Sequence, residues 1–211
     1  MNMKQIFRPL IGLERRLYIK RKRNKLKNRT ASILSSNCTG SIISHDMGCP
    51  FNSPTVNLYF LPEDFLKFLE RPQYYLDLVP VKAESPEPFP VGRLDDIFLY
   101  FMHYKSFEEA RDKWIQRSRR VDFDNLFVIM TDKSGCTEEQ IRRFDGLPYA
   151  NKVIFTHKAH SELQSAYYIK GFEEEKEVGI LTDWKPTFWK RRWLDEFDYV
   201  DFLNRKEETT D

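Results

Sequence analysis

Cysteine is scarce in this sequence. Only Cys38, Cys49 and Cys136 occur among 211 residues. An odd, small number of cysteines predicts no disulfide framework and is typical of a protein that stays in a reducing compartment. No apolar run approaches the length of a membrane-spanning helix. The N-terminal apolar stretch is broken by Arg8 and Pro9 and lacks a small-residue cleavage site, so a signal peptide is not expected. We therefore expect a soluble, cytoplasmic protein.

Familiar cofactor and metal motifs are missing as well. The sequence has neither a Walker phosphate loop nor a GxGxxG fingerprint, and no HExxH motif or paired cysteines. His157 and His160 lie one helical turn apart, but no further ligands accompany them. Asp122 and Asp124 form an Asp-x-Asp pair, yet this pair precedes a strand instead of following it. We predict no metal site and no cofactor.

What the sequence does contain is ample apolar surface and an uneven charge distribution. Hydrophobic residues make up 41% of the chain and aromatic residues 15%, which is enough for one sizeable core. Residues 1–30 carry eleven Lys or Arg and one acid, whereas the rest carries 23 basic and 31 acidic side chains. We predict a basic arm (1–30), a single α/β domain (31–203) and a solvated tail (204–211).

The arm has the pattern of a basic amphipathic helix over residues 3–28. Ile6, Leu10, Leu13 and Leu17 fall at helical spacing among many cations. Two interpretations stay open. The apolar stripe could lie on an anionic membrane, at its inner face, with Lys and Arg reaching the headgroups. Alternatively, the stripe packs on the domain and the cations are simply solvated.

The domain alternates strand-like apolar runs with helical patterns. Capping boxes at Ser106–Glu109 and Thr137–Gln140 predict helix starts, and Gly146 predicts a stop. Residues 82–90, with three prolines, predict an extended loop. Continuous apolar runs favour strands buried on both faces, so we predict an α/β fold with a three-layer, Rossmann-like, mostly parallel sheet. The predicted strands are Ser32–Ser36, Asp96–Met102, Leu126–Met130, Val153–Phe155 and Val178–Leu181.

Each of these runs leads into a polar or reactive residue. In open α/β sheets, ligands bind beyond the carboxyl ends of the strands, so these residues are expected to share one edge. Asp, Asn and Thr at such positions are also ordinary helix caps, whereas His103 and Cys38 are not preferred caps. The residues at the strand ends are Asn37, Cys38, His103, Asp132, His157 and Asp183.

Two chemistries fit the first strand end. Cys38, placed where a helix starts, could be a thiolate with His103 as its base and Asp132 orienting that base, as in a cysteine-dependent hydrolase or acyltransferase. Alternatively, the backbone around Gly40 could hold a phosphate at the helix start. Taken by itself, the segment Lys185–Trp193 has the mixture of basic and aromatic residues that binds nucleic acid. The domain as a whole is net acidic, however, so we expect no nucleic-acid partner.

Several short motifs resemble an uncharacterised bacterial family of exopolysaccharide or capsular polysaccharide biosynthesis proteins. The motifs are N-C-x-G from Asn37, S-P-x-x-N-L (Ser53–Leu58), F-M-H-Y (Phe101–Tyr104), K-W-x-x-R (Lys113–Arg117), D-N-L-F-V-I-M (Asp124–Met130) and K-V-I-F-T (Lys152–Thr156). They span roughly residues 30–160. Where the family has Trp followed by Gly-Gly after the cysteine, this chain has Thr39, Gly40 and Ser41.

The resemblance implies a role in surface-glycan assembly without naming a reaction. It carries over the positions Asn37, Cys38, Gly40, Asn57, His103, Tyr104, Trp114 and Arg117. Our leading hypothesis is a transferase that acts on a sugar or sugar-phosphate donor, with His103 as general base and Arg117 as phosphate partner. The alternatives are the cysteine-dependent enzyme and a non-catalytic scaffold of the synthesis complex.

Overall fold

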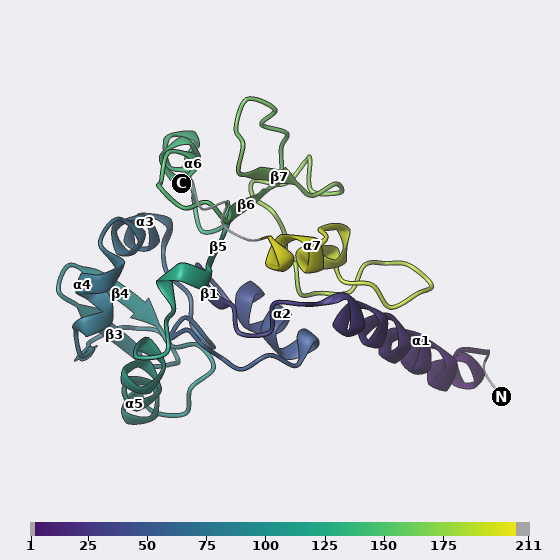
Figure 1. Cartoon of the computed structure of the whole chain (residues 1–211), viewed down its shortest axis with the longest axis horizontal. Helices are drawn as coiled ribbons and strands as arrows, with labels where there is room; N and C mark the ends of the chain where they lie inside the picture. Colours follow the sequence, from purple (N-terminus) through teal and green to yellow (C-terminus); the bar gives the residue numbers. More distant parts are fainter. Residues whose placement is uncertain (1–2, 206–211) are drawn as a thin grey trace.

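The chain is a mixed α/β protein with two separate sheets (Figure 1). The computed structural model describes residues 3–205, with side chains from residue 12 onward. A parallel sheet contains β1 (Ser32–Ser35), β5 (Leu126–Thr131), β6 (Lys152–Thr156) and β7 (Ala166–Tyr168), in that order. An antiparallel sheet contains β2 (Val81–Ala83), β3 (Val91–Leu94) and β4 (Ile97–Tyr100). The helices are α1 (Met3–Lys25), α2 (Thr39–Met47), α3 (Pro62–Glu70), α4 (Pro72–Asp77), α5 (Phe107–Ser118), α6 (Glu138–Asp145) and α7 (Tyr199–Asn204).

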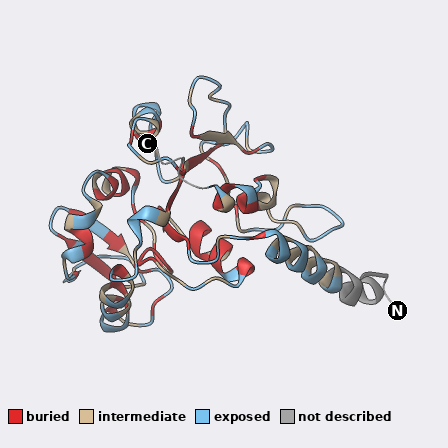
Figure 2. Ribbon diagram, in the orientation of Figure 1, coloured by how far each residue is buried: buried red, intermediate tan, exposed pale blue. Residues whose placement is uncertain are grey.

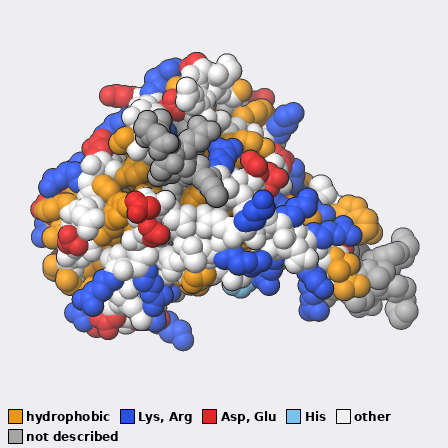
Figure 3. All heavy atoms as spheres, viewed as in Figure 1, with side chains coloured by type: hydrophobic (Ala, Val, Ile, Leu, Met, Phe, Trp, Pro, Cys, Tyr) orange, Lys and Arg blue, Asp and Glu red, His pale blue; other side chains and the backbone are white. Residues whose placement is uncertain are grey.

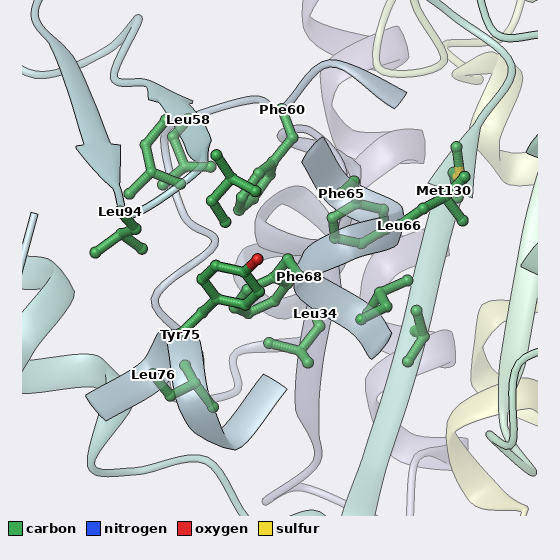
Figure 4. Packing of buried hydrophobic residues seen from close by; sticks show 14 of the residues in the cluster. Leu34, Leu58, Phe60, Phe65, Leu66, Phe68, Tyr75, Leu76, Leu94 and Met130 are labelled. Carbon is green, nitrogen blue, oxygen red and sulfur yellow. The ribbon is translucent and has the colours of Figure 1, made fainter. Parts of the chain in front are cut away.

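The parallel sheet is buried on both faces because successive residues of its strands point to opposite sides. Leu34 and Val128 belong to the hydrophobic cluster that includes α3, α5, α6 and the antiparallel sheet. Ile33 and Phe127 belong to a second cluster, with α2 and α7. Figure 4 shows the first cluster, where Phe65 and other α3 side chains pack toward the strands. The continuous apolar runs therefore predicted these buried strands correctly.

Both predicted helix starts are confirmed, but only the second has both hydrogen bonds of a capping box. The Ser106 hydroxyl accepts a hydrogen bond from Glu109 N at the start of α5. Thr137 and Gln140 form the reciprocal pair at the start of α6, and Gly146 follows its last residue. These contacts satisfy backbone N–H groups that have no partner in the first helical turn.

Parts of the predicted strand arrangement were wrong. Residues 96–102 do not join the parallel sheet, because β4 pairs antiparallel with β3. Residues 178–181 form no strand, whereas β7, which the sequence pattern did not reveal, pairs with β6. The predicted loop at 82–90 begins inside β2, whose last residues are 82 and 83. Asn204, predicted to start a solvated tail, is instead the last residue of α7, and its side chain accepts a hydrogen bond from Lys27 N. Residues 206–211 of that tail lie outside the described residues.

The N-terminal part of helix α1 extends away from the body of the molecule (Figure 1). Figure 2 shows few buried positions along it, in contrast to α2. The stripe residues Leu13 and Leu17 are 52% and 47% exposed, so at these positions the stripe does not pack on the domain. The other two stripe residues, Ile6 and Leu10, have side chains outside the described set. Within residues 3–205, no helix is both long and apolar enough to cross a membrane.

Candidate functional site

A cavity of about 280 Å³ lies at the carboxyl ends of β1 and β5. Because these neighbouring strands are parallel, their ends meet at one edge of the sheet. The loops before α3 and after β4, together with an irregular segment near residue 180, complete the walls. The lining residues are Ser36, Asn37, Cys38, Thr39, Tyr59, Phe60, Pro62, Met102, His103, Met130, Thr131, Lys133, Ser134, Gly179, Ile180, Leu181 and Thr182.

Asn37 organises this edge through its side-chain amide. Its Nδ2 donates to Thr131 Oγ1 at 2.9 Å, which ties the end of β1 to the end of β5. Its Oδ1 accepts from both the backbone N and the hydroxyl of Thr39, at 3.0 and 2.7 Å. Asn37 thus positions the first turn of α2 against the sheet. It also lines the cavity.

Cys38 lines the cavity but does not have the environment of a nucleophile. It is the residue that caps α2, yet burial raises the pKa of its thiol to about 11. Its Sγ lies 3.9 Å from Leu58 O, the acceptor of a weak S–H contact. The expectation that Cys38 is a thiolate at the helix start was therefore wrong, because loss of hydration on burial raises the pKa more than the backbone hydrogen bond with Asn57 lowers it.

His103 reaches the same cavity from the other sheet. It lies in the loop after β4, where its backbone N donates to Asn57 O at 3.3 Å. Asn57 has a left-handed backbone (φ 63°), which asparagine tolerates better than most residues. Asn57 therefore supports the loop that carries His103 and is not part of the lining. The exposed imidazole makes no hydrogen bond within residues 12–205, so it is available to a ligand.

Asp132 is not the partner of His103. Its carboxylate is almost fully buried and accepts from His157 Nδ1 at 2.5 Å and from His157 N at 2.8 Å. Its other oxygen accepts from Val178 N at 2.7 Å. The predicted Cys38–His103–Asp132 chain is thus not assembled. Asp132 instead ties β5 to β6 and to the segment that continues into the cavity wall.

Gly40 has a packing role. A Cβ at this position would lie 2.8 Å from side-chain atoms of Ile33 and Ser35, so the glycine lets α2 approach β1 closely. Its N–H donates to Ser35 Oγ at 3.2 Å. This amide and that of Thr39 already have partners within the chain, so the expected phosphate loop finds no support here.

Three further positions suggested by the resemblance lie outside the cavity. Arg117 Nη1 donates to the Tyr104 hydroxyl at 2.8 Å, and that hydroxyl donates to Val56 O at 2.9 Å. The Arg117 guanidinium also lies 5.4 Å from the centre of the Phe51 ring. Trp114 is 1% exposed in the core. These residues hold α5 and the loop after β4 in place.

Sequence reasoning missed several residues of the lining. Ser36 ends the first apolar run, and its buried Oγ has no hydrogen-bond partner among the described residues. Lys133 directly follows Asp132, so the strand-end rule could have found it. Its Nζ contacts Glu177 Oε1 at 3.0 Å and Val178 O at 3.1 Å. Tyr59 comes from a loop whose position depends on tertiary packing, and no local pattern marks it.

The raised pKa of Cys38 predicts slow alkylation. With a pKa near 11, only about one thiol in ten thousand is ionised at pH 7, so iodoacetamide should modify Cys38 far more slowly than a free thiol. The rate should rise with pH until about pH 11, because the thiolate is the reactive form. Mass spectrometry of peptides from native and urea-unfolded protein gives the comparison. Labelling of native Cys38 at pH 7 as fast as in the urea-unfolded chain would contradict the buried, protonated state.

Comparison with known proteins adds family membership. The family model described as "Domain of unknown function (DUF1919)" matches residues 12–204. A protein of Haemophilus influenzae (strain ATCC 51907 / DSM 11121 / KW20 / Rd), described as "Uncharacterized protein", is 43% identical over 206 residues. The match covers 97% of this chain and 99% of that protein. Neither description mentions a polysaccharide. All residues that line the cavity lie within the region that the family model matches. The chain belongs to the DUF1919 family.

Proposed function

We propose that this chain is a transferase that binds a sugar or sugar-phosphate donor in the cavity and acts in exopolysaccharide biosynthesis. One observation carries the proposal: the cavity at the ends of β1 and β5 combines the ammonium group of Lys133 with the exposed imidazole of His103, which has no hydrogen-bond partner among the described residues. A Rossmann-like, three-layer arrangement around the parallel sheet is part of the same proposal.

The remaining lining residues suit such a donor. The side chains of Asn37, Thr39 and Thr182 offer amide and hydroxyl groups for sugar hydroxyls, and Tyr59 offers an aromatic surface for a sugar ring. Lys133 supplies a cation at the strand end and replaces Arg117 as the proposed phosphate partner. Its contact with Glu177 would orient the ammonium group toward the ligand.

In the proposed reaction, His103 acts as general base. The imidazole takes the proton from an acceptor hydroxyl while the oxygen of that hydroxyl forms a bond to the anomeric carbon of the donor. The bond from that carbon to the phosphate oxygen breaks, and the phosphate group leaves with the electron pair. Lys133 would stabilise the negative charge that develops on the departing phosphate.

The two alternatives have weaker support. A cysteine-dependent hydrolase needs an ionised thiol and an oriented histidine, whereas the pKa of Cys38 is raised and Asp132 is bonded to His157. A non-catalytic scaffold has no need for an open cavity with an unpartnered imidazole. The transferase therefore explains more of the lining than either alternative.

Donor binding should raise the melting temperature of the protein. We expect at least one of UDP-glucose, GDP-mannose and glucose 1-phosphate to stabilise the wild type, since a ligand at a hundred times its Kd adds about 2.7 kcal/mol. Lys133→Met should weaken that binding by about ten- to a hundredfold, because a charge-assisted hydrogen bond to phosphate is lost. Thermal shift and titration calorimetry provide the measurements.

The matched control is Lys105→Met. Lys105 is exposed and lies in the same loop as His103, but it does not line the cavity. It should bind as the wild type does. His103→Gln should keep donor binding but lower transfer by about a hundred- to ten-thousandfold. Absence of a shift with all three donors would remove the transferase proposal, as would equal binding by the two lysine variants.

A further inference from the structure

Helix α1 packs against the body of the protein through its polar face. Arg15 forms ion pairs with Asp46 Oδ2 at 2.7 Å and with Asp195 Oδ2 at 2.5 Å, and all three side chains are largely buried. The Lys22 ammonium lies 3.6 Å from the centre of the Tyr199 ring. Arg23 Nε donates to Asp46 O at 2.6 Å. Cations, which usually face water, thus form much of the inner side of this helix, together with Ile19, which packs against the second hydrophobic cluster.

The opposite face of α1 presents apolar side chains to solvent. Leu13 and Leu17 lie one helical turn apart and are about half exposed. Arg16 and Lys20 share this face at helical spacing, are exposed, and make no salt bridge among the described residues. Figure 3 shows hydrophobic and basic atoms side by side on this arm. A leucine stripe flanked by free cations is the pattern of a helix that lies on an anionic surface.

A hairpin at residues 183–193 lies beside α1. Its strands are held together by an antiparallel bridge between Trp184 and Arg192 and by a 2.8 Å hydrogen bond from Lys185 N to Arg191 O. Trp184 and Trp189 are 46% and 52% exposed, and the neighbouring Phe188 is 60% exposed. The segment 184–192 carries four basic residues and no acidic one. Exposed tryptophans beside cations are typical of the interface between membrane and water.

The hairpin is attached directly to α1. Arg191 forms an ion pair with Glu14 at 2.6 Å, and its guanidinium lies 3.9 Å from the centre of the Tyr18 ring. The Arg15 guanidinium lies 5.4 Å from the centre of the Trp184 ring. The hairpin is therefore held against the side of α1 that carries Glu14, Arg15 and Tyr18, next to the outer face with Leu13 and Leu17.

We propose that α1 and the hairpin together form a docking surface for an anionic lipid bilayer, as on the inner face of the cell membrane. Leu13, Leu17 and the hairpin tryptophans would enter the headgroup boundary, while Arg16, Lys20 and Lys190 contact lipid phosphates. Charge complementarity favours this occupant, because residues 31–211 are net acidic and an anionic surface would attract only the basic side of the molecule. The proposal uses none of the residues of the proposed reaction, so it holds or fails independently of it.

The test is co-sedimentation of the full chain with vesicles. We expect binding to equimolar phosphatidylcholine–phosphatidylglycerol vesicles, weak binding to phosphatidylcholine alone, and loss of binding at high salt. Leu13→Asp/Leu17→Asp should lower the partition coefficient by at least about tenfold, because it places two charges on the inserting face. The matched control is Val79→Asp/Val81→Asp, which changes two residues that are 55% and 62% exposed before and in β2. This control should bind as the wild type does.

A second variant keeps the test decisive if the leucine variant fails to fold. Trp189→Ser should weaken vesicle binding by several-fold, since it removes one interfacial aromatic side chain and leaves α1 unchanged. Wild-type binding by both variants, or no binding by the wild type, would overturn the proposal. So would concentration-dependent self-association that Leu13→Asp/Leu17→Asp abolishes, which would assign the surface to a second copy. Salt-sensitive binding of duplex DNA or RNA, with none to vesicles, would assign it to nucleic acid.

Discussion

Asp132→Ala is expected to lower the free energy of unfolding by about 3–5 kcal/mol. The Asp132 side chain is 1% exposed and accepts three hydrogen bonds, two from His157 and one from Val178 N. Alanine leaves those donors buried without an acceptor and opens a small void between the ends of β5 and β6. Urea denaturation followed by circular dichroism measures the change. A value within about 1 kcal/mol of the wild type would contradict this role.

The matched control is Asp183→Ala. The sequence placed Asp183 at a strand end in the same way as Asp132, but in the structure it is exposed. Its loss should change stability by no more than about 0.5 kcal/mol. Asp132→Asn should fall between the two, since an amide oxygen can still accept from Val178 N but the amide cannot accept all three bonds. The order of the three variants distinguishes a buried carboxylate anchor from a general effect of removing acidic residues.

Much of the parallel sheet could be predicted from the sequence because its strands are buried on both faces. The run at 126–130 and the run at 153–155 correspond to β5 and β6, and their residues are nearly all inaccessible. Neither run contains a polar residue, so the apolar run itself marks the strand. The helix starts at Ser106 and Thr137 were equally readable, because their capping contacts join residues three apart.

The run at 96–102 shows where the pattern is ambiguous. It looked like a buried parallel strand, but β4 is an antiparallel strand with Phe98 38% exposed. An apolar run predicts that a segment is buried. It does not predict which strand the segment pairs with, or whether the pairing is parallel or antiparallel. His103 nevertheless reached the cavity, because the loop after β4 is tied to Asn57 beside the end of β1.

The candidate site was predicted in location and less well in composition. Asn37 and Cys38 line the cavity at the end of β1, as strand-end reasoning expected, whereas His103 lines it from the antiparallel sheet, which that reasoning did not foresee. The same reasoning could not say which neighbour Asp132 would contact. Thr131 pairs with Phe155 in the sheet, and this register brings Asp132 to His157, the residue two positions after Phe155. A contact between residues 25 positions apart depends on that register, which only the assembled sheet defines.

The motif around Trp114 illustrates the same limit for the resemblance. A short motif such as K-W-x-x-R marks positions without giving their role. In the structure, Trp114 packs at 6.1 Å from the Phe68 ring, edge to face, and Arg117 bonds to Tyr104. The motif therefore joins α5 to the core and to the loop that carries His103, and its effect on the cavity is indirect.

Trp114→Ala is accordingly expected to destabilise the protein by about 3–5 kcal/mol, the usual cost of removing a large aromatic side chain from a core. Trp114 is 1% exposed and belongs to the cluster beneath α3 and α5. The cavity left behind would be lined by Phe68 and its neighbours, and close packing would allow only partial collapse. Urea denaturation at fixed pH provides the free energy of unfolding.

Trp114→Phe separates a structural role from a binding role. Phenylalanine keeps the aromatic contact with Phe68 and removes the indole Nε1, which is buried without a partner among the described residues. The loss of stability should therefore be smaller, about 1–2 kcal/mol. Trp189→Ala, at an exposed position, should cost less than about 1 kcal/mol. If Trp114 contacted the donor, Trp114→Phe would weaken the ligand-induced thermal shift beyond its effect on stability. We expect that shift to be unchanged, because the polar lining of the cavity comes from residues outside α5: Ser36, Asn37, Thr39, His103, Thr131, Lys133, Ser134 and Thr182.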